Sequence, residues 1–368
     1  MPNPFAYGPP VKDPARFVGR KAELIRVFNA LDTAHTGQLQ SVSIVGPRRI
    51  GKSSLLNNLT QTYRQRVTQP ERYVVAHIDL QENKYNQSLE ALLRGILSDL
   101  ITALPASGEN LESLRKNLRA ASRGSLSLAD FETAMRQFST PHGPAWYPLL
   151  CLDEFEELTT HPDRFPDDLY DSWRSLANDN CVAFVTTSKQ KLSELMQAGK
   201  LTSSFHNVFI LQPLEELTEA EAETLVSWGR TCDRPFSDAD CRRAQQWAGG
   251  HPYQLQVAGS LTYEVKADPK PNWRKAERQY HEQVNENVER KPGRLKSWLE
   301  QILEAAGHLT SLLLKHQPKD KHEQRVMGLA ALFIVFLFLA TTIYISIYTL
   351  PFIATLIAMF LASRLMNK

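Results

Sequence analysis

The sequence predicts a three-layer α/β fold built on a parallel five-stranded sheet, followed by a helical lid and a C-terminal transmembrane helical hairpin. Short apolar segments alternate with longer stretches of helical spacing, which is the pattern of strands joined by crossover helices. A glycine-containing turn joins the first apolar segment to a helix, and a long stretch without charged residues ends the chain. The expected strands are residues 41–45, 72–80, 148–152, 181–185 and 207–211.

The length of 368 residues exceeds that of an average single domain. The formal net charge of +2 neither favours nor excludes a nucleic-acid partner. The four cysteines lack the paired spacing of a metal site or a disulfide framework, and no secretory leader precedes them, which indicates a cytoplasmic soluble part. We expect a core at residues 1–213, a lid at 214–290, an amphipathic helix and linker at 291–325, and the transmembrane hairpin at 326–363.

A phosphate-binding loop lies between the strand expected at 41–45 and a helix expected at 54–62. It reads Gly46-Pro47-Arg48-Arg49-Ile50-Gly51-Lys52-Ser53, which is a Walker A motif. Its glycines let the backbone wrap phosphate groups, Lys52 meets the β- and γ-phosphates, and Ser53 ligates Mg²⁺. The motif predicts bound ATP and Mg²⁺, with the nucleotide held by Gly46, Pro47, Arg48, Arg49, Ile50, Gly51, Lys52, Ser53 and Ser54.

An acidic motif follows the strand expected at 148–152. Asp153 stands where a neighbouring strand would bring a carboxylate to Mg²⁺, and Glu154 stands where it can polarise a water molecule. This Walker B arrangement predicts ATP hydrolysis, with Glu154 and Lys52 as catalytic residues and with Ser53 and Asp153 as the Mg²⁺ ligands. The nearby Glu156 and Glu157 are expected to be solvated at the start of a helix.

Three further stretches give less specific signals. Thr186-Thr187-Ser188 follows an expected strand, where one hydroxyl would sense the γ-phosphate or the residues would simply end the strand. Arg174 would either reach a neighbouring protomer's phosphate as an arginine finger or be a solvated surface group. Residues 87–137 show helical spacing around a polar middle, which predicts two helices and a loop.

Four stretches together resemble the AAA+/STAND branch of P-loop ATPases, in the group of archaeal-type ATPases and small bacterial AAA-like proteins. They are the Walker A loop, Leu152-Asp153-Glu154, the stretch from Asn3-Pro4-Phe5 to Phe17-Val18-Gly19-Arg20, and Gly249-Gly250-His251-Pro252-Tyr253. The resemblance covers residues 4–265. It implies that one further strand lies between the strand that carries Asp153 and the strand that feeds the P-loop.

The resemblance also implies roles outside the two phosphate motifs. The stretch from Asn3-Pro4-Phe5 to Phe17-Val18-Gly19-Arg20 would lie on the adenine and ribose side of the nucleotide, with Val18, Gly19 and Arg20 as its nucleotide-binding residues. Pro252, together with His251, would contact the base and report its state to the lid. The alternative for this motif is a glycine helix stop followed by a proline turn. The chain departs from the larger STAND proteins, because it has no long repeat array and little room for a winged-helix domain.

The stretch from Val326 to Ser363 contains no Asp, Glu, Lys, Arg, His, Asn or Gln. One straight helix of about 38 residues would extend about 57 Å, well beyond a hydrocarbon core of about 30 Å. Two short spans with a break near Pro351 are therefore expected, with a single tilted span as the alternative. Basic residues flank both ends, which predicts membrane attachment with both ends of the hairpin in the cytoplasm.

These expectations combine into a membrane-anchored switch that binds ATP and hydrolyses it slowly. The resemblance adds a role in bacterial signalling or defence, nucleotide-dependent assembly into a homo-oligomer, and a protein partner whose identity the sequence does not give. One alternative is a membrane-perturbing effector whose hairpins cluster on activation. Another is a nucleic-acid-handling ATPase, which is disfavoured because no basic domain with interleaved aromatic residues is evident. An apolar stripe at residues 295–314 would pack on the lid, on another protomer or on the membrane surface.

Overall fold

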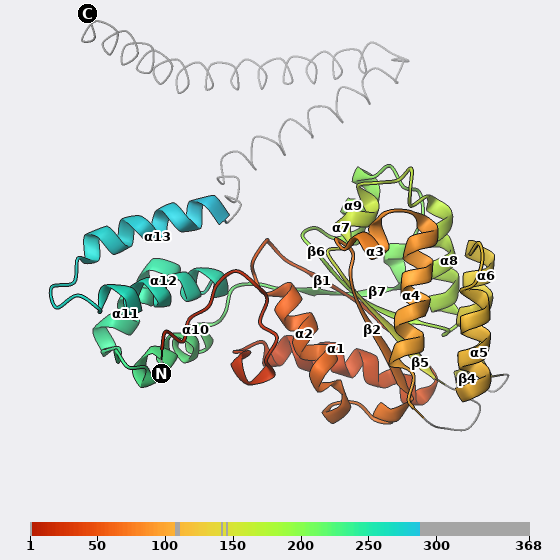
Figure 1. The fold of residues 1–368 in the computed structure, drawn as a ribbon, viewed down its shortest axis with the longest axis horizontal. Helices are drawn as coiled ribbons and strands as arrows, with labels where there is room; N and C mark the ends of the chain where they lie inside the picture. The colour runs from red at the N-terminus through yellow and green to blue at the C-terminus, as the bar shows by residue number, and fades with distance from the viewer. Residues whose placement is uncertain (1, 107–110, 141–142, 145, 288–368) are drawn as a thin grey trace, which may run out of the picture. The chain divides into compact units, whose positions relative to one another are not determined.

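The central sheet is parallel throughout and has the strand order β2-β5-β6-β1-β7 (Figure 1). The computed structural model describes residues 2–106, 111–140, 143–144 and 146–287. The strands are β1 (Ser41–Val45), β2 (Tyr73–Asp79), β5 (Tyr147–Asp153), β6 (Ala183–Ser188) and β7 (Phe209–Pro213). The predicted five-stranded parallel sheet is confirmed, and so is the strand between β5 and β1, which is β6.

β2 and β5 differ from their predicted bounds by one residue at each end, and β6 and β7 differ by two residues or more. β6 continues through Thr186-Thr187-Ser188, because these residues pair in parallel with residues 43–45 of β1. β7 begins only at Phe209, since the short 3-10 helix η5 occupies Phe205–Val208. The hydroxyl residues of β6 therefore belong to the carboxyl edge of the sheet, where they are fully buried.

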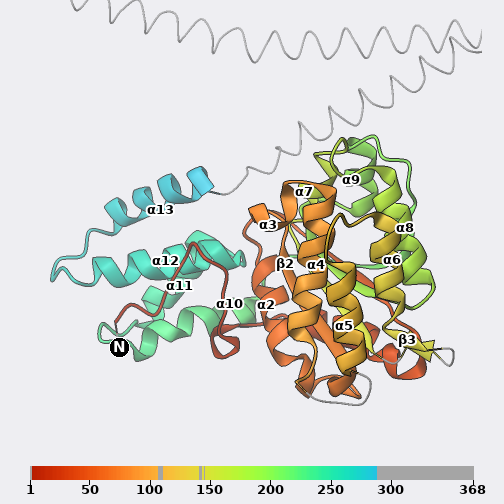
Figure 2. The ribbon, with the colours of Figure 1, turned by 45° about the vertical axis from the view of Figure 1, so that its right-hand side comes forward.

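Helices cover both faces of the sheet and make the core three-layered (Figure 1, Figure 2). Side chains alternate along β5: Leu150 and Leu152 face one apolar cluster, and Leu149 and Cys151 face the other. The first face carries α3 (Asn83–Asn86), α4 (Leu89–Ala103), α5 (Leu111–Ala121), α6 (Leu128–Arg136), α7 (Glu156–Thr159), α8 (Asp167–Asn178) and α9 (Leu192–Ala198). The second face carries α1 (Lys21–Asp32) and α2 (Lys52–Thr62).

Short elements connect these layers. They are the 3-10 helices η1 (Pro14–Arg16), η2 (Thr33–Thr36), η3 (Tyr63–Gln65) and η4 (Pro70–Arg72), and the small antiparallel ladder of β3 (Ser139–Thr140) with β4 (Gly143–Pro144). Residues 87–137 correct the sequence prediction, because they contain three helices, α4 to α6, instead of two helices and a loop. α6 begins at a capping box in which Ser127 and Asp130 exchange hydrogen bonds between side chain and backbone.

The lid is a group of helices with an apolar cluster of its own. Its elements are α10 (Glu219–Val226), η6 (Ser227–Thr231), α11 (Asp238–Ala248), α12 (Pro252–Val265) and α13 (Trp273–Asn287). Phe5 from the N-terminal segment belongs to this cluster. The Ala6 amide donates a hydrogen bond to Gln256 Oε1 on α12 at 3.1 Å. The first residues of the segment that we assigned to the core thus pack on the lid.

The described residues belong to one compact unit, Met1–Glu289. Within them, no helix has both the length and the apolar character to cross a membrane. The predicted amphipathic helix and linker at 291–325 and the predicted hairpin at 326–363 lie outside the described residues.

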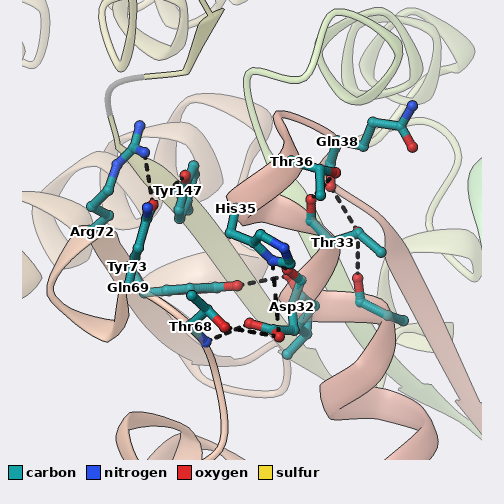
Figure 3. A network of polar contacts seen from close by, with 12 residues as sticks. Asp32, Thr33, His35, Thr36, Gln38, Thr68, Gln69, Arg72, Tyr73 and Tyr147 are labelled. Atoms are coloured by element: carbon teal, nitrogen blue, oxygen red, sulfur yellow. Dashed lines mark hydrogen bonds and ion pairs between the residues drawn. The ribbon is translucent and has the colours of Figure 1, made fainter.

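A polar network ties the amino ends of β2 and β5 to the end of α1 (Figure 3). Tyr73 begins β2, and its hydroxyl donates a hydrogen bond to the backbone oxygen of Leu31 at 2.7 Å. The Asp32 carboxylate accepts hydrogen bonds from the amide and the hydroxyl of Thr68. The Tyr147 hydroxyl, at the start of β5, donates to the side chain of Gln69 at 3.0 Å. These strand ends are opposite to those that lead into the P-loop and the acidic motif, so the network serves the fold.

We expect Tyr73→Phe to lower the free energy of unfolding by about 1 kcal/mol, because it removes a buried donor from the Leu31 oxygen and keeps the ring. Urea unfolding followed by circular dichroism measures the change. Tyr63→Phe is the matched control, since its ring lies 5.9 Å from that of Tyr73 between centroids and its hydroxyl has no hydrogen-bond partner among the described residues. Equal stability of the two variants would contradict a contribution from the hydrogen bond.

Candidate nucleotide-binding site

The P-loop lies between the end of β1 and the start of α2, as the sequence predicts. Gly51 has a φ of 103°, a left-handed conformation that glycine adopts without steric strain. Lys52 is the first residue of α2 and is buried. Its ammonium group donates hydrogen bonds to the backbone oxygens of Gly46 and Pro47, at 3.1 and 3.2 Å. The loop therefore holds its lysine against its own backbone.

The acidic motif leaves the sheet at the end of β5, beside the end of β6. The Thr187 hydroxyl donates a hydrogen bond to the Asp153 carboxylate. The Glu154 amide donates to Asp153 Oδ1 and to Thr187 Oγ1, both at 3.2 Å. Glu154 has a φ of 55°, which is uncommon for a residue other than glycine and tends to occur at functional sites. Its side chain lines the same pocket as Lys52.

Burial and, to a smaller extent, neighbouring charges shift the pKa values of Glu154 and Lys52. Burial raises the pKa of Glu154 to about 7, with a further contribution from the charge of Glu156 and an opposing one from Lys52. Burial lowers the pKa of Lys52, against the opposing charges of Glu154, Glu156 and Asp153. A carboxyl group whose pKa lies near neutrality is suited to accept a proton from water at physiological pH.

The prediction that Glu156 is solvated was wrong. Its side chain is only 15 % exposed, and its Oε1 lies 3.6 Å from the Nζ of Lys189. Lys189 follows β6 directly, and its charge contributes to the lowered pKa of Lys52, so it lies within electrostatic reach of the P-loop. The sequence analysis missed Lys189, although a basic residue directly after the hydroxyl residues of β6 was an available signal.

A pocket of about 260 Å³ lies between the P-loop, the N-terminal segment and the lid. Its charged lining is strongly one-sided, because Glu154 is the one acidic residue among the described residues that line it. The basic residues of the lining are Arg16, Arg20, Arg48, Arg49 and Lys52. Such an excess of cations in a concave site fits a polyanionic ligand.

The pocket brings together most of the predicted site residues. Those that line it are Val18, Arg20, Arg48, Arg49, Ile50, Gly51, Lys52, Ser53, Ser54, Glu154 and Pro252. Gly46 and Pro47 contribute the backbone oxygens that accept hydrogen bonds from Lys52. The Asp153 carboxylate accepts a hydrogen bond from the Glu154 amide. Gly19 packs against the lid, where a Cβ atom would stand 2.8 Å from the carboxyl group of Glu221. The predicted residues that do not line the pocket thus adjoin those that do.

The resemblance placed the stretch 3–20 and the motif at 249–253 near the nucleotide, but the sequence analysis did not name most of the individual residues with which they line the pocket. The additional lining residues are Ala6, Tyr7, Gly8, Pro9, Pro10, Val11, Arg16, Phe17, Leu217, Leu225, Tyr253 and Gln256. The segment 6–11 runs from the lid to α2, where the Val11 amide donates to the Ser54 hydroxyl at 3.0 Å. Gly8-Pro9-Pro10 signals a turn and extended chain, but no local signal indicates that this segment faces a ligand.

Two contacts join the core to the lid at the pocket. The Arg20 amide donates to Glu221 Oε1 of α10 at 2.8 Å, while the Arg20 guanidinium donates to the Ile50 oxygen of the P-loop at 3.2 Å. The Arg49 guanidinium lies 4.5 Å from the ring centroid of Tyr253, which is a cation–π contact. The P-loop is therefore linked to the lid through two of its own residues.

The donor set at the P-loop fits Mg²⁺. Mg²⁺ prefers oxygen ligands and commonly keeps phosphate and water oxygens in most of its positions. Ser53 offers a hydroxyl oxygen at the pocket, and Asp153 offers a buried carboxylate that Thr187 orients. These two residues are hence suited to complete the coordination of a metal ion that arrives with a nucleotide.

The structure places the remaining candidate residues of the sequence analysis at different distances from the pocket lining, and it does not test all of their predicted roles. Among the β6 hydroxyl residues, Thr187 contacts Asp153 and Glu154. A role of this strand end as a sensor of the γ-phosphate stays a prediction. Arg174 pairs with Asp171 on its own helix at 3.3 Å, and its role as an arginine finger also stays a prediction. Pro252 is the first residue of α12 and lines the pocket, so the motif ends one helix, begins another and faces the site. His251 is buried and does not line the pocket.

We expect the nucleotide-free protein to lose stability as the pH rises from about 4.5 to about 7, because Glu154 has a folded pKa of about 7 against an ordinary value of 4.5. The folded state favours the protonated carboxyl group, so this contribution is complete below the unfolded pKa and is lost as the pH rises through the folded one. Denaturant unfolding at a series of pH values measures the slope. Glu154→Gln should flatten it, whereas the control Glu157→Gln on α7 should not. An unchanged slope in Glu154→Gln would contradict the assignment.

The comparisons with known proteins agree with this geometry. Residues 16–178 match a family model of the AAA ATPase domain, and residues 148–289 match a model described as novel STAND NTPase 2. A search of curated proteins returned no match.

Among solved structures, the chain is similar to the Walker-type ATPase paby2304 of Pyrococcus abyssi, with 13 % identity, a TM-score of 0.51 and coverage of 88 % of this chain and 91 % of that one. It is also similar to the Orc1 protein of Aeropyrum pernix solved in complex with DNA, with 12 % identity, a TM-score of 0.48 and coverage of 87 % and 84 %. Identities this low show a shared fold alone. The two family matches together span residues 16–289, which are therefore similar to the AAA ATPase domain and to a STAND NTPase.

Proposed function

We propose that this chain is a switch that binds ATP with Mg²⁺ between its core and its lid and hydrolyses the ATP slowly. The observation that carries the proposal is the pocket at the P-loop, where five basic side chains and the Glu154 carboxyl group line one space that the lid helps to enclose. A triphosphate requires several cations for its charge, and its hydrolysis requires a group that can orient and activate water. Both requirements are met by residues of one pocket.

The binding step uses the cations that the P-loop and the N-terminal segment hold in place. Lys52 exchanges its bonds to two backbone oxygens for bonds to the β- and γ-phosphates, because a charged acceptor makes the stronger hydrogen bond. Val18 of the core and Pro252 of the lid both line the pocket, and we expect the base to contact them. The amides at the start of α2 face the phosphates, as in other Walker A motifs.

The hydrolytic step uses the acidic pair and its surroundings. When bound, ATP with Mg²⁺ supplies the phosphoanhydride bond and the divalent charge that offsets the phosphate oxygens. Ser53 and Asp153 hold the metal ion, and Glu154 orients the attacking water and accepts its proton. Burial and the charge of Glu156 make Glu154 basic enough for this role, and Glu156 in turn lies 3.6 Å from the Lys189 ammonium group.

The uncharged stretch 326–363 attaches this switch to a membrane in our proposal, because its length suffices for two spans and basic residues flank it. The conformational change between nucleotide states then acts at the membrane, in bacterial signalling or defence. In this proposal, ATP-bound protomers assemble into a homo-oligomer. The same stretch also favours a second candidate, in which clustered hairpins perturb the bilayer. The two candidates share the ATP site and differ in what the hairpin does.

We expect Lys52→Ala to weaken ATP binding by at least about tenfold, because it removes a charge-assisted hydrogen bond to phosphate. Glu154→Gln should still bind ATP but should lower turnover by about 10²-fold to 10⁴-fold, the range of general-base catalysis. Equilibrium binding of a fluorescent ATP analogue and phosphate release measure the two effects. Lys191→Ala is the control, since this lysine pairs with Glu194 at 4.0 Å and does not line the pocket. Equal binding and turnover in all these proteins would rule out the site.

We expect deletion of residues 326–368 to move the protein from the membrane fraction to the soluble fraction, while the ATP affinity changes by less than about twofold. Fractionation of cells and ATP binding by the purified variant measure these outcomes. Loss of localisation alone indicates an anchor. Loss of membrane damage on overexpression, measured by dye entry into cells, indicates a membrane-perturbing effector. Recovery of the full-length protein in the soluble fraction would contradict membrane attachment.

A further inference from the structure

α13 is the last described helix, and few buried groups fasten it to the lid. Among its described side chains, Ala276 and Tyr280 are buried and most of the others are exposed. The Tyr280 hydroxyl donates to the Trp247 oxygen at 2.7 Å, and the two rings stack at 5.7 Å between centroids. A helix held by so few buried contacts can undock at a low cost in free energy.

A polar contact leads from α13 to the nucleotide pocket. The Gln283 amide nitrogen on α13 donates a hydrogen bond to the Tyr7 hydroxyl oxygen at 3.1 Å, and its Oε1 lies 3.3 Å from the same hydroxyl. Tyr7 lines the pocket, whereas Gln283 does not. Gln283 can therefore influence a bound nucleotide through Tyr7.

Tyr7 is in turn connected to the P-loop through the lid. Its ring meets the ring of Tyr253 edge-on, at 6.2 Å between centroids and an interplanar angle of 83°. The Arg49 guanidinium of the P-loop lies 4.5 Å from the centroid of the same Tyr253 ring. Arg49, Tyr253, Tyr7 and Gln283 thus form a continuous series of contacts from the P-loop to α13.

We propose that α13 is the output element of the switch and that Gln283 is the positioning residue that couples its docking to the nucleotide pocket. This inference rests on the proposed function. A nucleotide in the pocket that Arg49 and Tyr7 line holds Tyr7 where Gln283 binds it, and docked α13 favours the form of the pocket that binds the nucleotide. Coupling between two sites is reciprocal, so each event stabilises the other. The chain continues from α13 to Lys368, so nucleotide release loosens the helix that carries the C-terminal part.

The test compares Gln283→Ala with Gln279→Ala in the full-length protein, because Gln279 lies on the same helix with an exposed side chain. Gln283→Ala should weaken binding of mant-ATP with Mg²⁺ by about twofold to tenfold, and Gln279→Ala should leave it unchanged. Tyr7→Phe should weaken binding as well, and its effect should be less than additive with that of Gln283→Ala, since both changes remove the hydrogen bond between these two side chains.

Hydrogen exchange gives a direct reading of α13 itself. The amides of residues 273–287 should become more protected when the wild-type protein binds mant-ATP, and Gln283→Ala should abolish that gain. A purely structural role of Gln283 would change protection equally with and without nucleotide.

Wild-type protein that binds mant-ATP without any change of exchange in α13 would overturn the inference and leave the proposed function intact, and equal affinity of a folded Gln283→Ala variant would overturn the role of Gln283. Absence of mant-ATP binding by the wild type would overturn the proposed function. The exchange measurement on the wild type decides even if a variant fails to fold.

Discussion

The parallel pairing of β5, β6 and β1 is the constraint on which the site depends. It brings the ends of three strands to one edge, where the Gly46 amide donates to the Ser188 oxygen at 3.2 Å and the Phe155 amide donates to the Thr187 oxygen at 2.9 Å. The loops that leave β1 and β5 are therefore both bonded to the end of β6. A shift of the register by one residue would move Asp153 to the opposite face of the sheet and away from Thr187. The P-loop and the Asp153 carboxylate are consequently placed by the same backbone hydrogen bonds.

The sheet and the phosphate-binding part of the site could be predicted because their signals are local. A glycine-containing loop between an apolar strand and a helix sets its own conformation, and the acidic pair stands at the end of its strand. The third helix of residues 87–137 also had a local signal, the Ser127 to Asp130 capping box, which we did not use. The burial of Glu156 had no such signal, because it depends on Lys189 at the end of another strand.

The remaining walls of the pocket could not be predicted, because they arise from the packing of distant segments. Phe5 fills the apolar cluster of the lid, and this contact fixes the path of residues 6–11 along the pocket. In the sequence, Tyr253 belongs to a motif that can also be interpreted as a glycine helix stop followed by a proline turn, with no role at a nucleotide. Its meeting with Arg49 requires that the lid fold back on the P-loop. Tertiary contacts of this kind decide which residues face a ligand, and sequence periodicity does not encode them.

The charge of the pocket gives a physical reason why its arrangement should depend on what it binds. Five basic side chains share the lining with Glu154, and like charges in a partly desolvated space repel one another. Two of these cations lie against aromatic rings of the lid, Arg49 at 4.5 Å from Tyr253 and Arg16 at 5.4 Å from Trp228. The N-terminal segment, the P-loop and the lid therefore meet around positive charge that the lining neutralises only in part. A bound polyanion stabilises the closed arrangement, in which all three segments surround it, relative to an open one. The size of this stabilisation is set by the difference between its affinities for the two arrangements.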